Sequence, residues 1–142
     1  MRRILAIDLG DRRVGIALSD ALGYTAQGLK TIDRRTFPHL MAAIAQLVKE
    51  YEVSRVLVGL PQNMDGSYGP RAHAAELFAE RLQKALKLPV ELIDERLTTV
   101  QATRILHTTG KDARHQRDVI DTVAATLILE QYLARARNEG TK

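Results

Sequence analysis

The chain of 142 residues contains no cysteine and no tryptophan, and only four tyrosines and two phenylalanines. The absence of cysteine excludes disulfide bonds and thiolate metal sites, and it fits a cytoplasmic protein. The scarcity of aromatic residues argues against a single-strand binder that stacks successive bases on a row of rings. No apolar stretch approaches the roughly 20 residues of a membrane-spanning helix. The short apolar run near the N-terminus is interrupted by Asp8, which argues against a signal peptide.

Charge and length point to a small basic globular protein. Lysine and arginine number 21 against 17 acidic residues, which gives a net charge of +4. This balance favours a polyanionic partner such as nucleic acid and gives no reason to expect a membrane partner. The length fits one hydrophobic core, so we expect a single domain over residues 1–137 and a disordered tail over 138–142.

Apolar periodicity predicts an α/β fold with five strands and four helices. The strands are expected over 3–9, 14–20, 28–32, 53–59 and 90–95. Helices are expected from Pro38 onward and over 71–86, 98–107 and 118–137, with a polar loop over 109–118. The first three strands are predicted to be antiparallel and the first, fourth and fifth parallel, in one mixed sheet flanked by helices.

Three acidic residues lie where apolar residues are expected. Asp8 closes an apolar strand, Glu95 ends another, and Asp121 falls on the same helical face as Ala125 and Ile128. A buried carboxylate without compensation costs several kcal/mol, on the order of other buried charges. Because ligand sites in α/β sheets gather at the carboxyl ends of parallel strands, the three acids together predict a divalent-metal site.

Each acid also has an ordinary explanation. Asp8 could be a turn residue that pairs with Arg12 or Arg13. Glu95 could stand at the entry of the next helix, and Asp121 could be a first-turn acid favoured by the helix dipole. The joint placement of the three is therefore the stronger signal.

Two neighbouring acids have a weaker claim on the site. Asp118 lies one turn before Asp121 on the same side of the helix, and the helix dipole alone explains it well. Asp94 alternates with Glu95 along the strand, so only one of the two can face the metal. We expect that one to be Glu95.

The chemistry of the donors indicates the metal and the reaction. Carboxylate ligands suit Mg²⁺ or Mn²⁺, whereas the four histidines are scattered and do not have the spacing of a zinc site. Two such ions held by carboxylates serve in-line attack on phosphodiesters. A basic chain with this site is predicted to be a nuclease.

Two segments are predicted to contact phosphates. The polar segment 109–118 is rich in basic residues, and the loop that follows the fourth strand is rich in turn formers and leads into a helix N-terminus. A solvated charge cluster and an ordinary surface turn are the respective alternatives. The predicted nucleic-acid-binding residues are Arg12, Arg13, Asn63, Arg71, Lys111, Arg114 and Arg117.

Four parts of the chain carry a family resemblance. They are residues 6–20, Gly59–Gly66, Asp94–Thr99 and Asp121–Glu130, and together they are similar to the YqgF/RuvX family in order and spacing over nearly the whole chain. The Asp-Glu-Arg-Leu-Thr-Thr motif and the Gly-Leu-Pro loop are the most specific parts. The resemblance implies a ribonuclease H-like fold and a metal-dependent nuclease whose catalytic acids are Asp8, Glu95 and Asp121.

The resemblance also implies two competing substrates. One role is processing of the 5′ end of pre-16S ribosomal RNA, which we favour, and the other is cleavage of four-way DNA junctions. Related resolvases carry a fourth acid at the position of Asp118. Symmetric junction cutting would require a homodimer.

Two other functions fit parts of the sequence. An Asp-Leu-Gly segment before an arginine turn also resembles the phosphate loop of sugar-kinase-like ATPases, but those enzymes need two such domains. A catalytically silent nucleic-acid-binding module on the same fold is the second alternative. Cleavage assays with Mn²⁺ and measurements of ATP binding distinguish these functions.

Overall fold

The computed structural model describes residues 3–10, 12–34, 37–61, 65–94 and 113–138, and the side chains of all of these except 37, 113–121, 137 and 138. The elements in chain order are β1 (Arg3–Leu9), β2 (Arg13–Ser19), β3 (Ala26–Asp33), α1 (Phe37–Glu50), β4 (Val53–Leu60), α2 (Pro70–Leu86), β5 (Val90–Asp94) and α4 (Ala113–Asn138). The predicted helix over 98–107 lies outside the described residues.

The five strands form one mixed sheet in the order β3-β2-β1-β4-β5. β2 is antiparallel to both β1 and β3, and β4 is parallel to both β1 and β5. The predicted topology is therefore confirmed. The last residues of the three parallel strands, Leu9, Leu60 and Asp94, lie along one side of the sheet, which we call the carboxyl edge. The opposite side, where the β2–β3 turn lies, is the amino edge.

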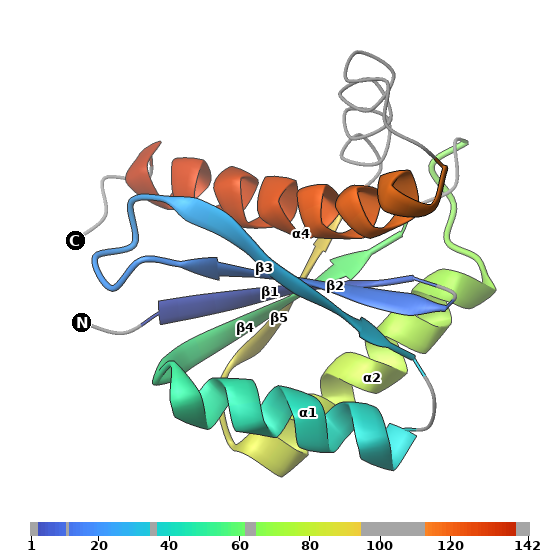
Figure 1. Cartoon of the computed structure of the whole chain (residues 1–142), viewed down its shortest axis with the longest axis horizontal. Helices are drawn as coiled ribbons and strands as arrows, with labels where there is room; N and C mark the ends of the chain where they lie inside the picture. The colour runs from blue at the N-terminus through green and yellow to red at the C-terminus, as the bar shows by residue number, and fades with distance from the viewer. Residues whose placement is uncertain (1–2, 11, 35–36, 62–64, 95–112, 139–142) are drawn as a thin grey trace.

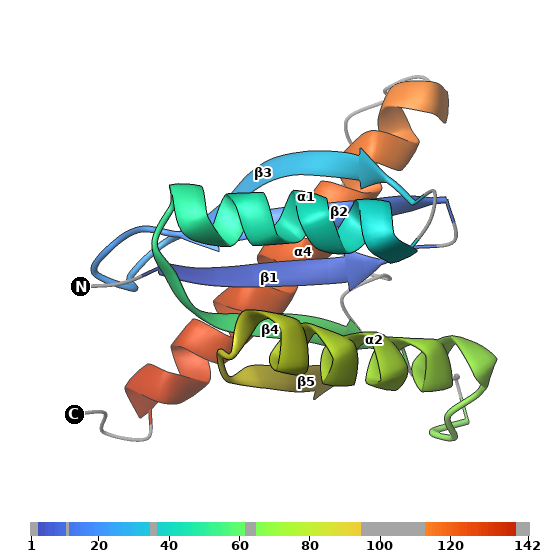
Figure 2. The same ribbon diagram turned by 90° about the horizontal axis from the view of Figure 1, so that it is seen from below.

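Helices cover both faces of the sheet. α1 and α2 pack on one face, and α4 crosses the other face diagonally (Figures 1 and 2). Side chains alternate between the two cores along each strand. On β1, Leu5 and Ile7 belong to the core under α1 and α2, whereas Ala6 belongs to the core under α4. We call the side of the sheet that α4 covers the α4 face.

Small residues let α4 approach the sheet closely. Ala6 and Ala17 supply the α4 face of β1 and β2, and they pack with Ala125 of the helix. On β3 the corresponding position is Gly28, where a Cβ atom would overlap the side-chain methyl of Thr122. Close packing at this crossing therefore requires a residue without a side chain.

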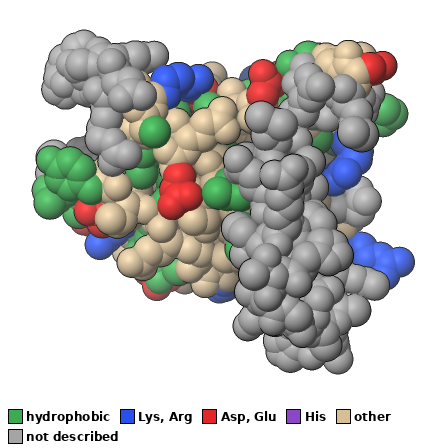
Figure 3. Space-filling view, turned by 90° about the horizontal axis from the view of Figure 1, so that it is seen from above, with side chains coloured by type: hydrophobic (Ala, Val, Ile, Leu, Met, Phe, Trp, Pro, Cys, Tyr) green, Lys and Arg blue, Asp and Glu red, His purple; other side chains and the backbone are tan. Residues whose placement is uncertain are grey.

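Figure 3 looks onto the outer side of α4. The described lysine and arginine side chains lie around its rim, and an acidic side chain lies closer to its centre. No helix among the described residues is long and apolar enough to span a membrane.

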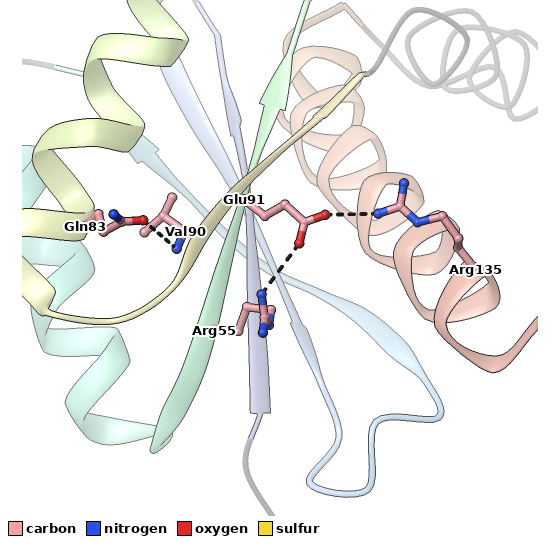
Figure 4. Close-up of polar contacts among 5 residues, drawn as sticks. All are labelled: Arg55, Gln83, Val90, Glu91 and Arg135. Carbon is pink, nitrogen blue, oxygen red and sulfur yellow. Dashed lines mark hydrogen bonds and ion pairs between the residues drawn. The ribbon is translucent and has the colours of Figure 1, made fainter. Parts of the chain in front are cut away.

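One ion-pair network connects the second half of α4 to the edge strand β5. Glu91 accepts from Arg135 of α4 at 3.0 Å and faces Arg55 of β4 at 3.5 Å (Figure 4). The Arg135 guanidinium also lies 5.7 Å from the centre of the Tyr132 ring. Because the three charged side chains are partly exposed, each pair is worth only about 0–1 kcal/mol. The network therefore fixes where the helix crosses β5 more than it stabilises the fold.

The start of α4 corrects the sequence analysis. Residues 113–118 are helical, although the segment 109–118 was predicted to be a loop. The prediction was wrong because the segment has no apolar periodicity, yet arginine, glutamine and alanine have high intrinsic helix propensity. α4 also includes Asn138, which was assigned to the tail, and residues 139–142 lie outside the described part of the chain.

We predict that Gly28→Ala destabilises the fold by about 1–3 kcal/mol, the usual cost of overpacking. The added Cβ meets the Thr122 methyl, and either the side chain or α4 has to move. The free energy of unfolding in urea measures the effect. Thr122→Ser in the same variant removes the methyl and is expected to restore most of the loss. A Gly28→Ala protein as stable as the wild type would contradict the close approach of α4.

Candidate active site

Asp8 is the only charged side chain that is buried among the described residues, with 9% of its surface exposed. It lies one residue before the end of β1, at the carboxyl edge. Because Ala6 faces α4 and side chains alternate, Asp8 lies on the α4 face as well. The rigid central strand therefore holds one carboxylate at the carboxyl edge, under the helix that carries Asp121.

Both strand neighbours of Asp8 are glycines. Gly15 of β2 is its partner in the antiparallel register. On β4, Gly59 follows Val58, which is the partner of Ile7. Neither neighbouring strand therefore places a side chain beside the Asp8 carboxylate on the α4 face.

The remaining predicted acids are only partly described. Glu95 lies outside the described residues. Asp121 and Asp118 belong to α4, but their side chains are not among those described. The helical stripe that motivated Asp121 is present, since Ala124, Ala125 and Ile128 are all buried against the sheet. Among the described residues no three acids or histidines form a cluster that could hold a metal, so the set Asp8, Glu95 and Asp121 stays a prediction.

Asp94 is turned away from the α4 face. Ile93 packs in the core under α4, so the next side chain points to the opposite face. Asp94 is exposed there and accepts a hydrogen bond of 2.9 Å from the Tyr68 hydroxyl. This bond to the carboxylate raises the pKa of Tyr68 above its ordinary value, because it favours the protonated hydroxyl.

The β1–β2 turn places arginines at the carboxyl edge. Arg12 is exposed, and Arg13 is half-buried at the start of β2. The turn is fixed by Arg34, whose backbone N–H donates to the Arg12 carbonyl at 2.8 Å and whose guanidinium donates to the Gly10 carbonyl at 2.8 Å. These bonds hold the turn beside the end of the strand that carries Asp8.

The loop before α2 also lies at the carboxyl edge. Its turn is formed by Asp65, whose carboxylate accepts from the backbone and hydroxyl of Ser67, and by Gly66 with φ +91°. α2 begins at Pro70 after Gly69, which supplies no side-chain cap, and Arg71 in the first turn is exposed.

The other predicted phosphate-binding residues are less fully placed. Asn63 and Lys111 lie outside the described residues. Arg114 and Arg117 belong to the first turns of α4, and their side chains are not described.

Sequence reasoning missed Arg34 and Tyr68. Arg34 directly follows Asp33, which pairs with Arg13 in the β2–β3 register. A hairpin drawn in full register from the sequence would have placed it beside the β1–β2 turn. Tyr68 and Asp94 are 26 residues apart, and no local pattern connects them.

Comparisons with known proteins agree on one family. The sequence model of RuvX, described as a Holliday junction resolvase, matches residues 2–135. A Moorella thermoacetica protein named "Putative pre-16S rRNA nuclease" is 51% identical over 97% of this chain and 99% of its own. A Myxococcus xanthus protein of the same name is 47% identical over 98% of this chain and 92% of its own.

Solved structures agree on the fold. RuvC of T. thermophilus in complex with a Holliday junction substrate superposes with a TM-score of 0.63 at 16% identity, over 100% of this chain and 99% of that one. The fowlpox virus Holliday junction resolvase gives a TM-score of 0.55 at 12% identity, over 94% and 99%. The fold is ribonuclease H-like, as predicted, and the chain belongs to the RuvX family.

Proposed function

We propose that the protein is a divalent-metal-dependent nuclease that hydrolyses phosphodiester bonds in structured nucleic acid. The observation that carries the proposal is the buried carboxylate of Asp8 between Gly15 and Gly59 at the carboxyl edge. A family of nucleases and resolvases supplies the reaction class, and the position of Asp8 agrees with the place where α/β folds build their sites.

The substrate that we favour is the 5′ region of pre-16S ribosomal RNA, on which the protein would act in the cytoplasm. The names of the relatives at 47–51% identity support this choice. A four-way DNA junction is the second candidate, supported by the description of the family itself. Junction cutting on two strands would need a homodimer.

One experiment tests the function and chooses the substrate. Cleavage is measured with Mg²⁺ and with Mn²⁺ on a four-way DNA junction, a DNA duplex, a structured RNA that carries the precursor end, and a linear RNA. Faster cleavage of the structured RNA supports rRNA processing, and faster cleavage of the junction supports resolution. Binding without cleavage of any of the four would contradict a nuclease and support the silent module.

The residues at the site fit a hard divalent cation. The Asp8 carboxylate is an oxygen donor of the kind that Mg²⁺ and Mn²⁺ prefer, and it is held by a central strand with glycine on both sides. Glu95 and Asp121 would complete the ligand set, with Asp118 as a candidate fourth ligand. A bound ion would lower the pKa of a water and stabilise the leaving oxygen.

The alternation of side chains along β5 supports Glu95, the next residue in the chain, as a metal ligand. Ile93 lies on the α4 face and Asp94 on the other. The alternation, continued by one residue, returns to the α4 face, which is the side of Asp8. Asp94 accepts a hydrogen bond from the Tyr68 hydroxyl instead.

Basic residues would hold the substrate backbone at the same edge. Arg12 and Arg71 are exposed there, and the Arg34 bonds fix the turn from which Arg12 and Arg13 extend. Arginine guanidinium groups bind phosphate oxygens in pairs of hydrogen bonds and keep the strand in register. Asn63, Lys111, Arg114 and Arg117 are proposed to extend this surface.

We predict that Asp8→Asn lowers the cleavage rate below one tenth of the wild-type rate while the protein stays folded. The substitution keeps the shape but removes the negative charge, and a tenfold loss corresponds to about 1.4 kcal/mol in barrier height. Single-turnover cleavage measures the loss, and thermal unfolding without metal checks the fold. Asp33→Asn, on an exposed acid at the same edge, is the control and is expected to keep its activity. A rate above one tenth in Asp8→Asn would exclude the central role.

We predict that Glu95→Gln and Asp121→Asn are nearly inactive, whereas Asp94→Asn cleaves at least about tenfold faster than either. Asp94 lies on the other face and is exposed, and asparagine still offers an acceptor to Tyr68. The same cleavage assay compares the three variants. An inactive Asp94→Asn together with an active Glu95→Gln would show that the order of faces is reversed.

We predict that changing Lys111, Arg114 and Arg117 to alanine flattens the salt dependence of nucleic-acid binding. Each cation that contacts a phosphate contributes about one unit to the slope of log affinity against log salt. Fluorescence anisotropy at several salt concentrations gives the slope.

The control for that measurement changes the same number of charges elsewhere. Lys49, Arg81 and Lys84 are exposed on the last turn of α1 and the second half of α2, toward the amino edge. Their replacement by alanine is expected to leave most of the slope intact. Equal slopes in the two triple variants would assign the first cluster to solvent.

A further inference from the structure

Tyr68 is an exposed aromatic side chain at the carboxyl edge. It lies on the loop between β4 and α2, and 51% of its surface is accessible. Among the described tyrosines only Tyr24, on the β2–β3 turn at the amino edge, is more exposed, at 62%. A large exposed ring at the same edge of the sheet as Asp8 is a feature that recognition uses more often than stability does.

The tip of the Tyr68 side chain is fixed. Its hydroxyl donates to Asp94 at the end of β5 across 2.9 Å, and this bond to the carboxylate raises the pKa of the phenol, so the hydroxyl stays protonated at neutral pH. Because the polar end is engaged, the exposed half of the side chain is mainly ring surface. A ring held in one orientation loses little entropy when a flat partner stacks on it.

The surroundings leave the ring accessible. Ser67 and Gly69 flank it in sequence, and neither is bulky. The turn before it is fixed by the Asp65 carboxylate and by the positive φ of Gly66. The exposed Arg71 follows on the first turn of α2, so the ring lies in a segment that also offers a phosphate partner.

We propose that the Tyr68 ring is a stacking platform for one unpaired base of the substrate strand at the carboxyl edge. This inference rests on the proposed nuclease function and narrows its substrate to nucleic acid with an unstacked nucleotide beside a paired region. Aromatic rings bind such bases by stacking, whatever the base, because every base has a π face. The chain has few aromatic residues and one suitable ring at this edge among its described residues, so a single base is held rather than a row.

The test compares two RNAs and four proteins in EDTA, so that binding is read without cleavage. One RNA is a duplex with a single-stranded tail whose first unpaired base is 2-aminopurine, and the other is the same duplex with a blunt end. The proteins are the wild type, Tyr68→Phe, Tyr68→Leu and the control Tyr24→Leu. Anisotropy gives affinity, and the 2-aminopurine emission reports stacking of that base.

The wild type is expected to bind the tailed RNA more tightly than the blunt duplex and to change the 2-aminopurine emission. Tyr68→Leu loses about tenfold or more of the affinity for the tailed RNA, since one stacked base is worth ~1–3 kcal/mol, and it loses the emission change. Tyr68→Phe keeps the ring, stays within about fivefold, the worth of one hydrogen bond, and keeps the emission change. Tyr24→Leu behaves as the wild type.

Other results overturn the proposal. Equal losses in Tyr68→Phe and Tyr68→Leu would mean that the hydroxyl only ties the loop to β5. Equal affinity of the wild type for the two RNAs would mean that no unpaired base is held. These outcomes are separable from the nuclease function, because a wild type that cleaves while Tyr68→Leu binds normally refutes the stacking alone. A wild type that shows the emission change but cleaves nothing refutes the nuclease alone.

Discussion

The close approach of α4 to the sheet is the constraint on which the rest of the structure depends. Where the helix crosses β1, β2 and β3, the close approach depends on small residues, with alanine on β1 and β2 and glycine at position 28 of β3. The strands β4 and β5 carry the larger Leu57 and Ile93 beneath the helix. The other face of the same strands carries leucine, isoleucine and valine, which fill the wider space under α1 and α2. The first three strands therefore carry small residues toward α4 and large residues toward α1 and α2.

The small residues on the α4 face of the central strands reduce the cost of burying Asp8. A carboxylate that projects from a central strand under a distant helix would be surrounded by bulky apolar side chains, at a high desolvation cost. Here the residues that flank it on β2 and β4 are Gly15 and Gly59, so neither neighbouring strand adds an apolar side chain beside the carboxylate.

The sequence was sufficient for the strands and their topology because those depend on short-range patterns. Alternation over 5–8 residues defines each strand, and the turn residues between β1 and β2 define a hairpin. The burial of Asp8 could also be anticipated, since an acid inside an apolar run is visible without a structure.

The features that were missed depend on information that composition does not carry. The sequence of the first turns of α4 has no apolar periodicity. The Tyr68–Asp94 hydrogen bond joins segments 26 residues apart. Arg34 donates to backbone carbonyls, which every residue has, so the sequence does not mark its partners. Alternation along the strand predicted that only one of Asp94 and Glu95 faces the site and favoured Glu95. The structure places Asp94 on the face opposite Ile93, and Glu95 stays a prediction.

The charged residues of β5 have a consequence for how the chain meets other chains. An unpaired edge strand is a template on which a further strand can add, and proteins protect such edges with charge. Glu91 projects on one face of β5 and Asp94 on the other. A strand added at this edge would therefore partly desolvate both carboxylates. The short edge strand thus resists continuation of the sheet.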